Sequence, residues 1–128
     1  MDKILAEISA GELIDKITIL EIKKEKISNE EKLVEVNKEL ISLNETLKKS
    51  INNDENKILS FKNDLKNINL KLWDIEDGKR SAEKNNKFDE KFIQLARNVY
   101  KFNDERAKIK LAINNALGSN IKEVKSYE

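Results

Sequence analysis

The chain contains 128 residues, of which 25 are Lys or Arg and 24 are Asp or Glu, and it has neither His nor Cys. The formal net charge of +1 disfavours nucleic-acid binding, because a domain that binds phosphates by bulk electrostatics normally carries a basic excess. The missing His and Cys exclude imidazole catalysis, disulfide bonds, thiol nucleophiles and zinc sites that use these ligands. Any metal would therefore need oxygen ligands, which favours Mg²⁺. We expect no cofactor, and a bound Mg²⁺ ion is the less favoured alternative.

The length indicates a single helical domain over residues 1–128. The opening MDKILAEISAGEL lacks the basic start and the apolar run of a signal peptide. No apolar run approaches the roughly 20 residues that a membrane helix requires. We therefore expect a cytoplasmic protein without a membrane span.

Capping residues mark the first two predicted helices. Ser9 and Glu12 have the spacing of a capping box, which predicts a helix over 10–27. The stretch from Ser28 to Glu31 repeats the box and predicts a second helix over 29–51.

Two longer helices are predicted in the second half of the chain. A heptad stripe predicts a helix over 54–86, and Asp89 caps another over 90–117, which Gly118 ends. The first stripe runs through Ile58, Phe61, Leu65, Ile68, Leu72, Ile75, Lys79 and Ala82. The second runs through Phe92, Ala96, Val99, Asn103, Arg106, Lys110, Ile113 and Leu117, so polar side chains interrupt it.

Short connections between consecutive helices predict antiparallel neighbours. The fold class is therefore all-α: an antiparallel four-helix bundle or helical hairpins, with a long, coiled-coil-like hairpin formed by 54–86 and 90–117. The far end of this hairpin is expected to project, and a projecting apolar stripe tends to bind a partner, often a second copy. Residues 3–8 and 121–127 alternate weakly between apolar and polar side chains, which favours short extended segments that pair as a ribbon.

Charged and polar residues of the long hairpin are expected to face each other across it. Folding the chain near residue 86 brings opposite charges to the same level without further adjustment. The expected pairs are Glu76 and Asp77 with Arg97 and Asp64 with Lys110, while Arg106 is expected to lie across from Asn67 and Asn69. On the structural interpretation, these contacts only set the register of the hairpin and need no ligand.

A binding interpretation starts from the rarity of arginine. The chain has only three, Arg80, Arg97 and Arg106, all in the long hairpin, and its single tryptophan, Trp73, lies level with Tyr100. A guanidinium group binds carboxylate or phosphate in a bidentate way that lysine cannot copy. An anion pocket between the two long helices is the resulting hypothesis.

The first helix offers a weaker metal hypothesis. Glu12 and Asp15 share one helix face, and with the carboxylates of 74–77 they would provide oxygen ligands for Mg²⁺, as in some all-helical pyrophosphohydrolases. Glu12 already has a role in the capping box, so the metal interpretation is disfavoured.

Three stretches together resemble a family of small helical proteins of unknown function that occur in bacteria and some phages. They are GELIDKITILEIKKEKI at 11–27, LWDIEDGKRSAE at 72–83 and FIQLARNVYKFNDERAKIKLAIN at 92–114, and the resemblance extends to EVKSY at 123–127. It implies no established activity, substrate or cofactor, although some relatives are encoded near glycosyltransferases for surface polysaccharides. The family pattern passes through Trp73, Glu76, Asp77, Arg97, Tyr100, Asn103, Asp104, Arg106 and Lys110.

A looser resemblance is to the helical chorismate mutases, whose first helix has a rhythm similar to Ile14-Asp15-Lys16-Ile17. Those enzymes hold a dianionic substrate with cationic side chains by electrostatic preorganisation. The arginine of their first helix has no counterpart here, so this enzyme class is disfavoured.

Two functions are kept, of which the first is favoured, and for the protein as a whole a non-enzyme is favoured over an enzyme. The first is an accessory protein that binds a protein partner, or itself as a homodimer, through the long hairpin. The alternative is a binding module or small enzyme for an anionic metabolite such as a nucleotide, sugar phosphate or carboxylate. The candidate binding residues are Trp73, Glu76, Asp77, Arg80, Arg97, Tyr100, Asn103, Arg106 and Lys110.

Overall fold

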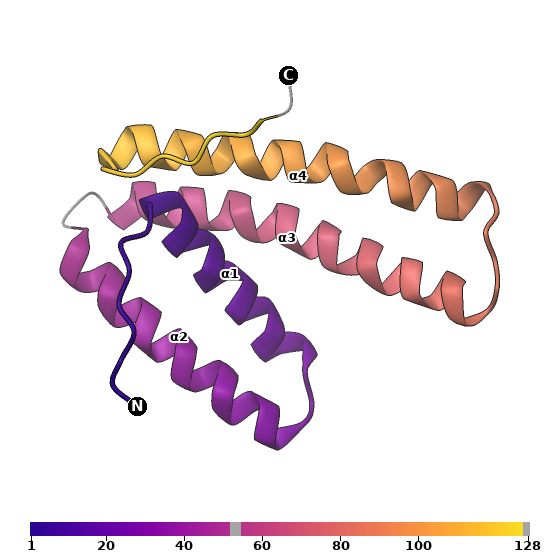
Figure 1. The fold of residues 1–128 in the computed structure, drawn as a ribbon, viewed down its shortest axis with the longest axis horizontal. Helices are drawn as coiled ribbons and strands as arrows, with labels where there is room; N and C mark the ends of the chain where they lie inside the picture. Colours follow the sequence, from indigo (N-terminus) through magenta and orange to yellow (C-terminus); the bar gives the residue numbers. More distant parts are fainter. Residues whose placement is uncertain (52–54, 127–128) are drawn as a thin grey trace.

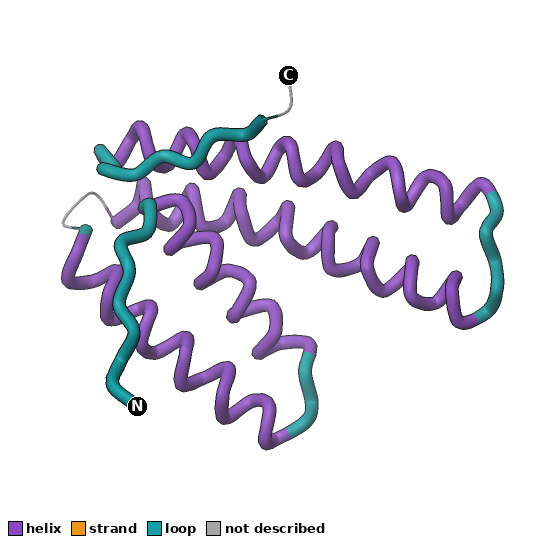
Figure 2. The backbone as a smooth tube through the Cα atoms, viewed as in Figure 1, coloured by secondary structure: helices purple, strands orange, loops and turns teal. Residues whose placement is uncertain are grey.

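The computed structural model describes residues 1–51 and 55–126, and within these the chain forms four helices and no strand (Figures 1 and 2). The helices are α1 (Ala10–Lys26), α2 (Glu30–Ser50), α3 (Glu55–Lys84) and α4 (Glu90–Leu117). The predicted all-α fold class is confirmed. None of the helices in the described parts of the chain is long and apolar enough to span a membrane.

The helices are arranged as two hairpins of unequal length. The long helices α3 and α4 lie side by side, and the shorter α1 and α2 form a second hairpin that crosses them near one end (Figure 1). Helix α1 packs against all three others, whereas α2 packs mainly against α1 and adds Leu47 to the cluster that α1 forms with α3 and α4. The far half of the α3/α4 hairpin therefore projects beyond the short helices (Figure 1).

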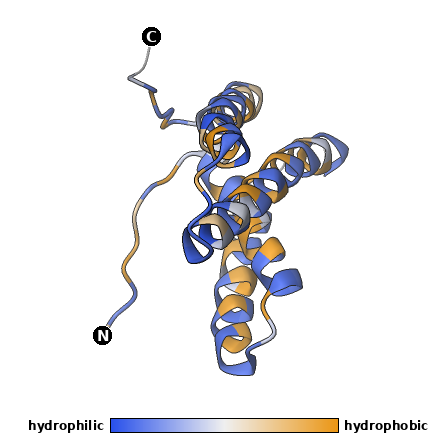
Figure 3. Cartoon of the chain, turned by 90° about the vertical axis from the view of Figure 1, so that its right-hand side faces the viewer, coloured by the Kyte–Doolittle hydropathy of each residue, from blue (hydrophilic) through white to orange (hydrophobic). Residues whose placement is uncertain are grey.

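The central position of α1 follows from its composition, because it buries apolar side chains on two sides. Hydrophobic and hydrophilic residues alternate along every helix, as expected for amphipathic helices (Figure 3). One face of α1 packs against α2 in a cluster of Leu13, Ile17, Leu20, Val36 and Leu40. The other face meets α3 and α4 in a cluster of Ile14, Leu65 and Ile113.

Local capping signals set the helix ends. Ser9 Oγ accepts a hydrogen bond from the Glu12 amide at 3.0 Å, and Asp89 accepts one from the Phe92 amide at 3.3 Å. Asn29 Oδ1 accepts the corresponding bond at the start of α2. Helix α3 ends at Lys84, two residues before its predicted end, while its predicted start at residue 54 lies outside the described residues.

A residue with a left-handed backbone conformation follows each of the two long helices. Asn86 has a φ of 52° in the turn after α3, and Gly118 has a φ of 67° as the C-cap of α4. Positive φ is common for glycine and tolerated by asparagine, so both residues suit the ends of helices.

The two chain ends do not pair as a ribbon within the described residues. Residues 119–126 run back along α4, and the first eight residues extend away from the helices (Figures 1 and 3). A side-chain bond of 2.8 Å from Asn120 to Glu7 joins the segments. Residue 127 of the predicted segment lies outside the described residues.

A cluster of polar contacts fastens the C-terminal segment over the start of α1. The Glu123 carboxylate accepts hydrogen bonds from Ser9 Oγ and from Asn114 Nδ2, and Ser119 Oγ accepts one from the Ala10 amide at 3.1 Å. Burial acts to raise the pKa of Glu123, but the bond from Ser9, the charge of Lys110 and the bond from Asn114 outweigh it. The pKa of Glu123 therefore lies below its ordinary value.

Helix α1 approaches α4 so closely that only glycine fits at position 11. The Gly11 amide donates a hydrogen bond of 2.7 Å to Asn114 Oδ1. A Cβ atom at this position would lie 2.5 Å from the Lys110 carbonyl oxygen and 2.9 Å from Asn114 Oδ1. The crossing of the two hairpins thus depends on the missing side chain.

We expect Gly11→Ala to lower the free energy of unfolding by at least about 2 kcal/mol, because the new methyl group meets backbone that cannot move independently. Gly78→Ala is the matched control, since its Cβ would meet only the mobile end of Leu95 at 3.0 Å and alanine favours a helix. Urea unfolding of both variants measures the difference. Equal effects of the two substitutions would show that the approach at Gly11 is not tight.

The lowered pKa of Glu123 makes the stability of the fold depend on pH. Because the folded-state pKa lies below the unfolded value of about 4.3, the carboxylate stabilises the fold above that pH. This contribution is lost as the pH falls through the folded pKa. The gap in unfolding free energy between wild type and Glu123→Gln should therefore narrow from pH 7 to pH 3, and a constant gap would contradict the assignment.

Candidate functional site

A buried carboxylate marks the point where α1 crosses the long hairpin. The Asp15 side chain is 1% exposed, and Arg106 of α4 binds both of its oxygens. Arg106 Nε donates to Oδ1 at 3.0 Å, while its Nη2 donates to Oδ2. Asn69 of α3 donates to Asp15 Oδ1 at 2.9 Å, so three helices meet at one carboxylate.

The groups around Asp15 complete this polar network. Thr18 Oγ1 donates to the Asp15 carbonyl oxygen at 2.7 Å and accepts a bond from Asn69 Nδ2 at 2.9 Å. The bond to Asp15 raises the pKa of Arg106 further, although desolvation opposes the shift, so the guanidinium stays charged. Among the described residues, every buried side-chain nitrogen or oxygen has a hydrogen-bond partner. The network is therefore a structural connection between the hairpins.

Lysine 110 forms a second connection between α4 and α1. Its Nζ lies 2.6 Å from Glu12 Oε2 and 3.9 Å from Asp15 Oδ2. Lys16 approaches the other oxygen of Glu12 at 3.7 Å. Glu12 thus pairs with lysines, in place of the return bond expected in the capping box.

The ion pairs expected between the two long helices do not form. Arg106 and Lys110 pair with carboxylates of α1, because α1 packs against the face of the hairpin that carries them. The sequence pattern did not indicate which helix covers this face. Arg97 is exposed on α4, and within the described residues its side chain makes no ion pair or hydrogen bond. Glu76 pairs instead with Lys79 on its own helix at 3.3 Å. The expected pairs that are corrected here are those of Arg97 with Glu76 and Asp77 and of Lys110 with Asp64. Arg106 and Asn69 do meet across the hairpin, because both donate to Asp15 Oδ1.

The structure also places the two metal candidates. Glu12 and Asp15 both point toward cationic side chains of α4, which neutralise them. In the described residues no three carboxylates come together in a way that would hold a metal ion. Glu12 and Asp15 thus have cationic partners, and the Mg²⁺ hypothesis stays a prediction.

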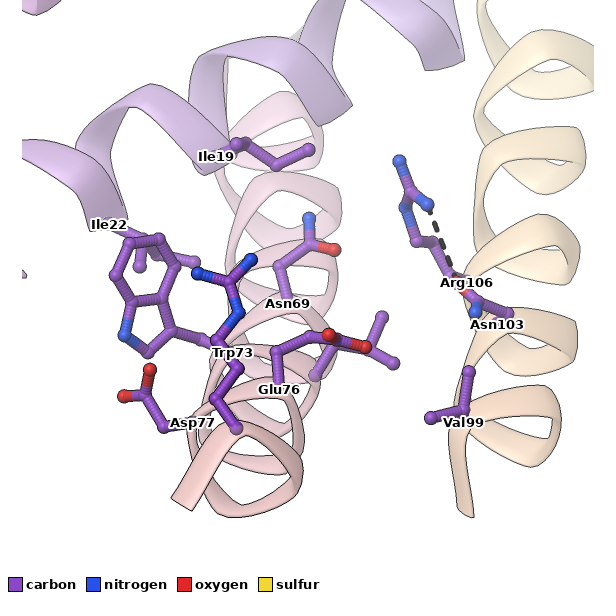
Figure 4. A pocket seen from close by; sticks show the side chains of 11 residues that line it. Ile19, Ile22, Asn69, Trp73, Glu76, Asp77, Val99, Asn103 and Arg106 are labelled. Carbon is purple, nitrogen blue, oxygen red and sulfur yellow. Dashed lines mark hydrogen bonds between the residues drawn. The ribbon is translucent and has the colours of Figure 1, made fainter. Parts of the chain in front are cut away.

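A cleft opens beside the Asp15 network, where α1 diverges from α4 (Figure 1). Its volume is about 390 Å³. In Figure 4, Trp73 and Asp77 of α3 lie on one side, and Val99, Asn103 and Arg106 of α4 lie on the other. The full lining consists of Ile19, Ile22, Asn69, Leu72, Trp73, Glu76, Asp77, Arg80, Val99, Asn103 and Arg106.

Six of the nine predicted binding residues line this cleft, namely Trp73, Glu76, Asp77, Arg80, Asn103 and Arg106. Tyr100 and Arg97 are exposed on α4 outside it, and Tyr100 is 59% exposed. Lys110 lies further along α4, beside Glu12. The nine predicted residues therefore divide into six that line the cleft, two that are exposed outside it, and Lys110, which connects α4 to α1.

Two charged side chains of the cleft are without a partner. Asp77 and Arg80 lie three residues apart on α3, yet neither makes an ion pair or hydrogen bond within the described residues. By contrast, Arg106 binds Asp15 through Nε and Nη2, and its Nη1 lies 3.5 Å from Asn103 Oδ1. The cleft thus offers one free carboxylate, one free guanidinium and the remaining donors of Arg106.

The wall contributed by α1 is absent from the predicted set. Ile19 and Ile22 line the cleft, and Asp15 fixes Arg106 behind it. One signal was present in the sequence: Asp15 and Thr18 are polar residues spaced three apart within the apolar pattern of the first helix. That spacing indicates a buried polar contact but does not name the helix that makes it.

A second hollow, of about 760 Å³, lies between α4 and the C-terminal segment. Arg106 and Lys110 line it, but both are paired with α1, and Lys125 pairs with Asp104. Three of its four cations are therefore already neutralised, which leaves Lys108. A lysine cannot bind an anion in the bidentate way that Arg80 can, so we regard the first cleft as the better candidate.

These features define a small all-α protein in which two helical hairpins are joined by a buried ion pair beside a charged cleft. The chain belongs to DUF6165, a family of unknown function, whose family model matches residues 4–128. No curated protein matches the chain, and no solved structure matches it either.

We expect Arg106→Ala to lower the free energy of unfolding by about 3–5 kcal/mol, because it leaves the buried Asp15 carboxylate without its counter-charge. Arg97→Ala, which removes an exposed and unpaired arginine from the same helix, should change it by less than about 0.5 kcal/mol. Chemical denaturation compares the two variants. A similar loss of unfolding free energy in both variants would contradict the conclusion that Asp15 and Arg106 connect the hairpins.

Proposed function

We propose that the protein is an accessory module that binds a small anionic metabolite in the cleft between α1, α3 and α4. The observation that supports this most directly is Arg80, a guanidinium that lines the cleft and has no partner among the described residues. A planar guanidinium binds carboxylate and phosphate groups by paired hydrogen bonds. The spare donors of Arg106 lie in the same lining and add to the attraction for an anion.

The size and lining of the cleft suit a small molecule. Its volume of about 390 Å³ falls within the usual range for ligand sites, roughly 300–1,000 Å³. Ile22, Leu72 and Val99 supply apolar surface, and Trp73 supplies a flat aromatic wall. Such sites typically combine an apolar lining with a few polar groups that orient the ligand.

Binding is favoured over catalysis by the groups in the cleft. The chain has no His and no Cys, and the cleft carboxylates Glu76 and Asp77 are exposed. A general acid or base is usually set apart by burial or by a charged neighbour that shifts its pKa toward neutrality. The proposed role is therefore recognition of a metabolite, in a cytoplasmic protein of bacteria or phages.

A second candidate function is contact with a protein partner through the far end of the α3/α4 hairpin. Phe88 and Ile93 are exposed there, at 52% and 41%, and Tyr100, further along α4, is 59% exposed. Exposed apolar and aromatic side chains at a projecting end are a common basis for protein contacts. None of the three lines the cleft, so binding of a partner protein or of a second copy is independent of the metabolite.

The cleft is tested by a thermal-shift screen of sugar phosphates, nucleotides and carboxylates. A ligand present at 100 times its Kd should stabilise the folded protein by about 2.7 kcal/mol. Arg80→Ala should abolish the shift, whereas Arg97→Ala, an exposed arginine outside the cleft, should preserve it. The proposal fails if no anion raises the melting temperature, or if a ligand that does so binds Arg80→Ala and wild type equally well.

A further inference from the structure

The unpaired groups of the cleft are of two opposite kinds. Arg80 and the amide nitrogen of Asn103 donate hydrogen bonds, whereas the Asp77 carboxylate only accepts them. The side-chain oxygen of Asn103 accepts a hydrogen bond from Arg106 Nη1 at 3.5 Å. Its amide nitrogen therefore remains without a partner within the described residues. A ligand that satisfies this lining must therefore carry an acceptor, preferably charged, together with donor groups for Asp77.

The net charge of the lining limits how negative the ligand can be. Arg80 and Arg106 contribute two positive charges, and Glu76 and Asp77 contribute two negative charges, so the lining is formally neutral. Asp15 already holds Arg106, and Lys79 already holds Glu76. The cleft can compensate one anionic group next to Arg80, but further phosphates would meet carboxylates and be repelled.

The shape of the lining adds a third requirement. Trp73 lies opposite Val99 and Arg106 across the cleft, close to Ile22 (Figure 4). A ring that presents C–H groups on its face and hydroxyl groups at its edge suits an aromatic wall bordered by carboxylate and amide groups. Hydroxyl groups both donate and accept, so they pair equally well with Asp77 and with the Asn103 amide nitrogen.

Resting on the proposed function, we infer that the ligand is a hydroxyl-rich ring with a single anionic group, such as a sugar monophosphate. In this arrangement Arg80 binds the anion, Asp77 and Asn103 bind hydroxyl groups, and Trp73 contacts the face of the ring. Nucleoside triphosphates are rejected because the neutral lining cannot compensate their charge.

The test uses the single tryptophan, Trp73, as a fluorescence reporter within the cleft. The full chain is titrated with glucose 6-phosphate, ribose 5-phosphate, glucose, inorganic phosphate and ATP. At least one sugar phosphate should bind at least about tenfold more tightly than glucose, inorganic phosphate or ATP, since each of these lacks one required feature or carries excess charge.

Two variants separate the roles of the charged groups. Asp77→Asn should weaken binding of the sugar phosphate about tenfold and leave the weak binding of inorganic phosphate unchanged. Arg80→Ala should weaken both. Asp74→Asn is the matched control, because Asp74 is an exposed carboxylate on the same helix outside the cleft, and it should bind like wild type.

The outcomes distinguish the ligand class from the cleft itself. If ATP or another anion binds more tightly than both sugar phosphates and depends on Arg80, the ligand class is wrong while the binding site stands. The class is also wrong if Asp77→Asn and Asp74→Asn have equal effects on the sugar phosphate. If no anion binds, both the class and the proposed function are overturned.

Discussion

The contact between Asp15 and Arg106 is the interaction on which the arrangement of the two hairpins depends. A carboxylate that is almost fully buried stays charged only at a high cost unless it is paired and hydrogen-bonded. Arg106 and Asn69 meet this requirement from two different helices, which fixes the position of α1 over both. The nearby approach of Gly11 to Lys110 allows the helices to come close enough for the pair to form.

The cleft is a consequence of the same crossing. Helix α1 stays close to α3 up to its last turns, where Glu21 pairs with Lys62 and Glu25 with Lys66, but it diverges from α4. Side chains of α3 and α4 beyond the crossing therefore remain accessible (Figure 1). Arg106 belongs to both regions, since it binds Asp15 on one side and lines the cleft on the other. A binding site beside a buried ion pair has a rigid wall, and rigid walls reduce the entropy lost when a ligand binds.

Local sequence features were sufficient to predict the elements of this fold. Capping by Ser9 and Asp89 and the left-handed end at Gly118 involve residues only a few positions apart, so they can be recognised in the sequence. The heptad stripes likewise identified most of the inward-facing residues of α3 and α4, although Asn69 and Asn114 are buried outside them. The partners of the polar positions could not be predicted in this way, because Arg106 and Asp15 are 91 residues apart. Periodicity shows that a face is covered, but it does not show which helix covers it.

The same limit explains the outcome for the candidate site. Trp73, Asp77 and Arg80 were predicted from their types and spacing, and they do meet in one cleft. Arg97 was assigned to this group because folding the hairpin near residue 86 placed it opposite Glu76 and Asp77. The crossing by α1 makes the faces of the hairpin different, and Arg97 remains on solvent-exposed surface.

The packing of α2, which is mainly against α1, has a consequence for the motions of the chain. Detaching α2 would expose Leu13, Leu20 and Leu40, yet it would leave every contact of α1 with α3 and α4 in place. Opening of this helix therefore costs less free energy than unfolding of the whole domain. In a native-state hydrogen-exchange experiment, the amides of α2 would lose protection as a separate unit before those of the helices that surround Asp15.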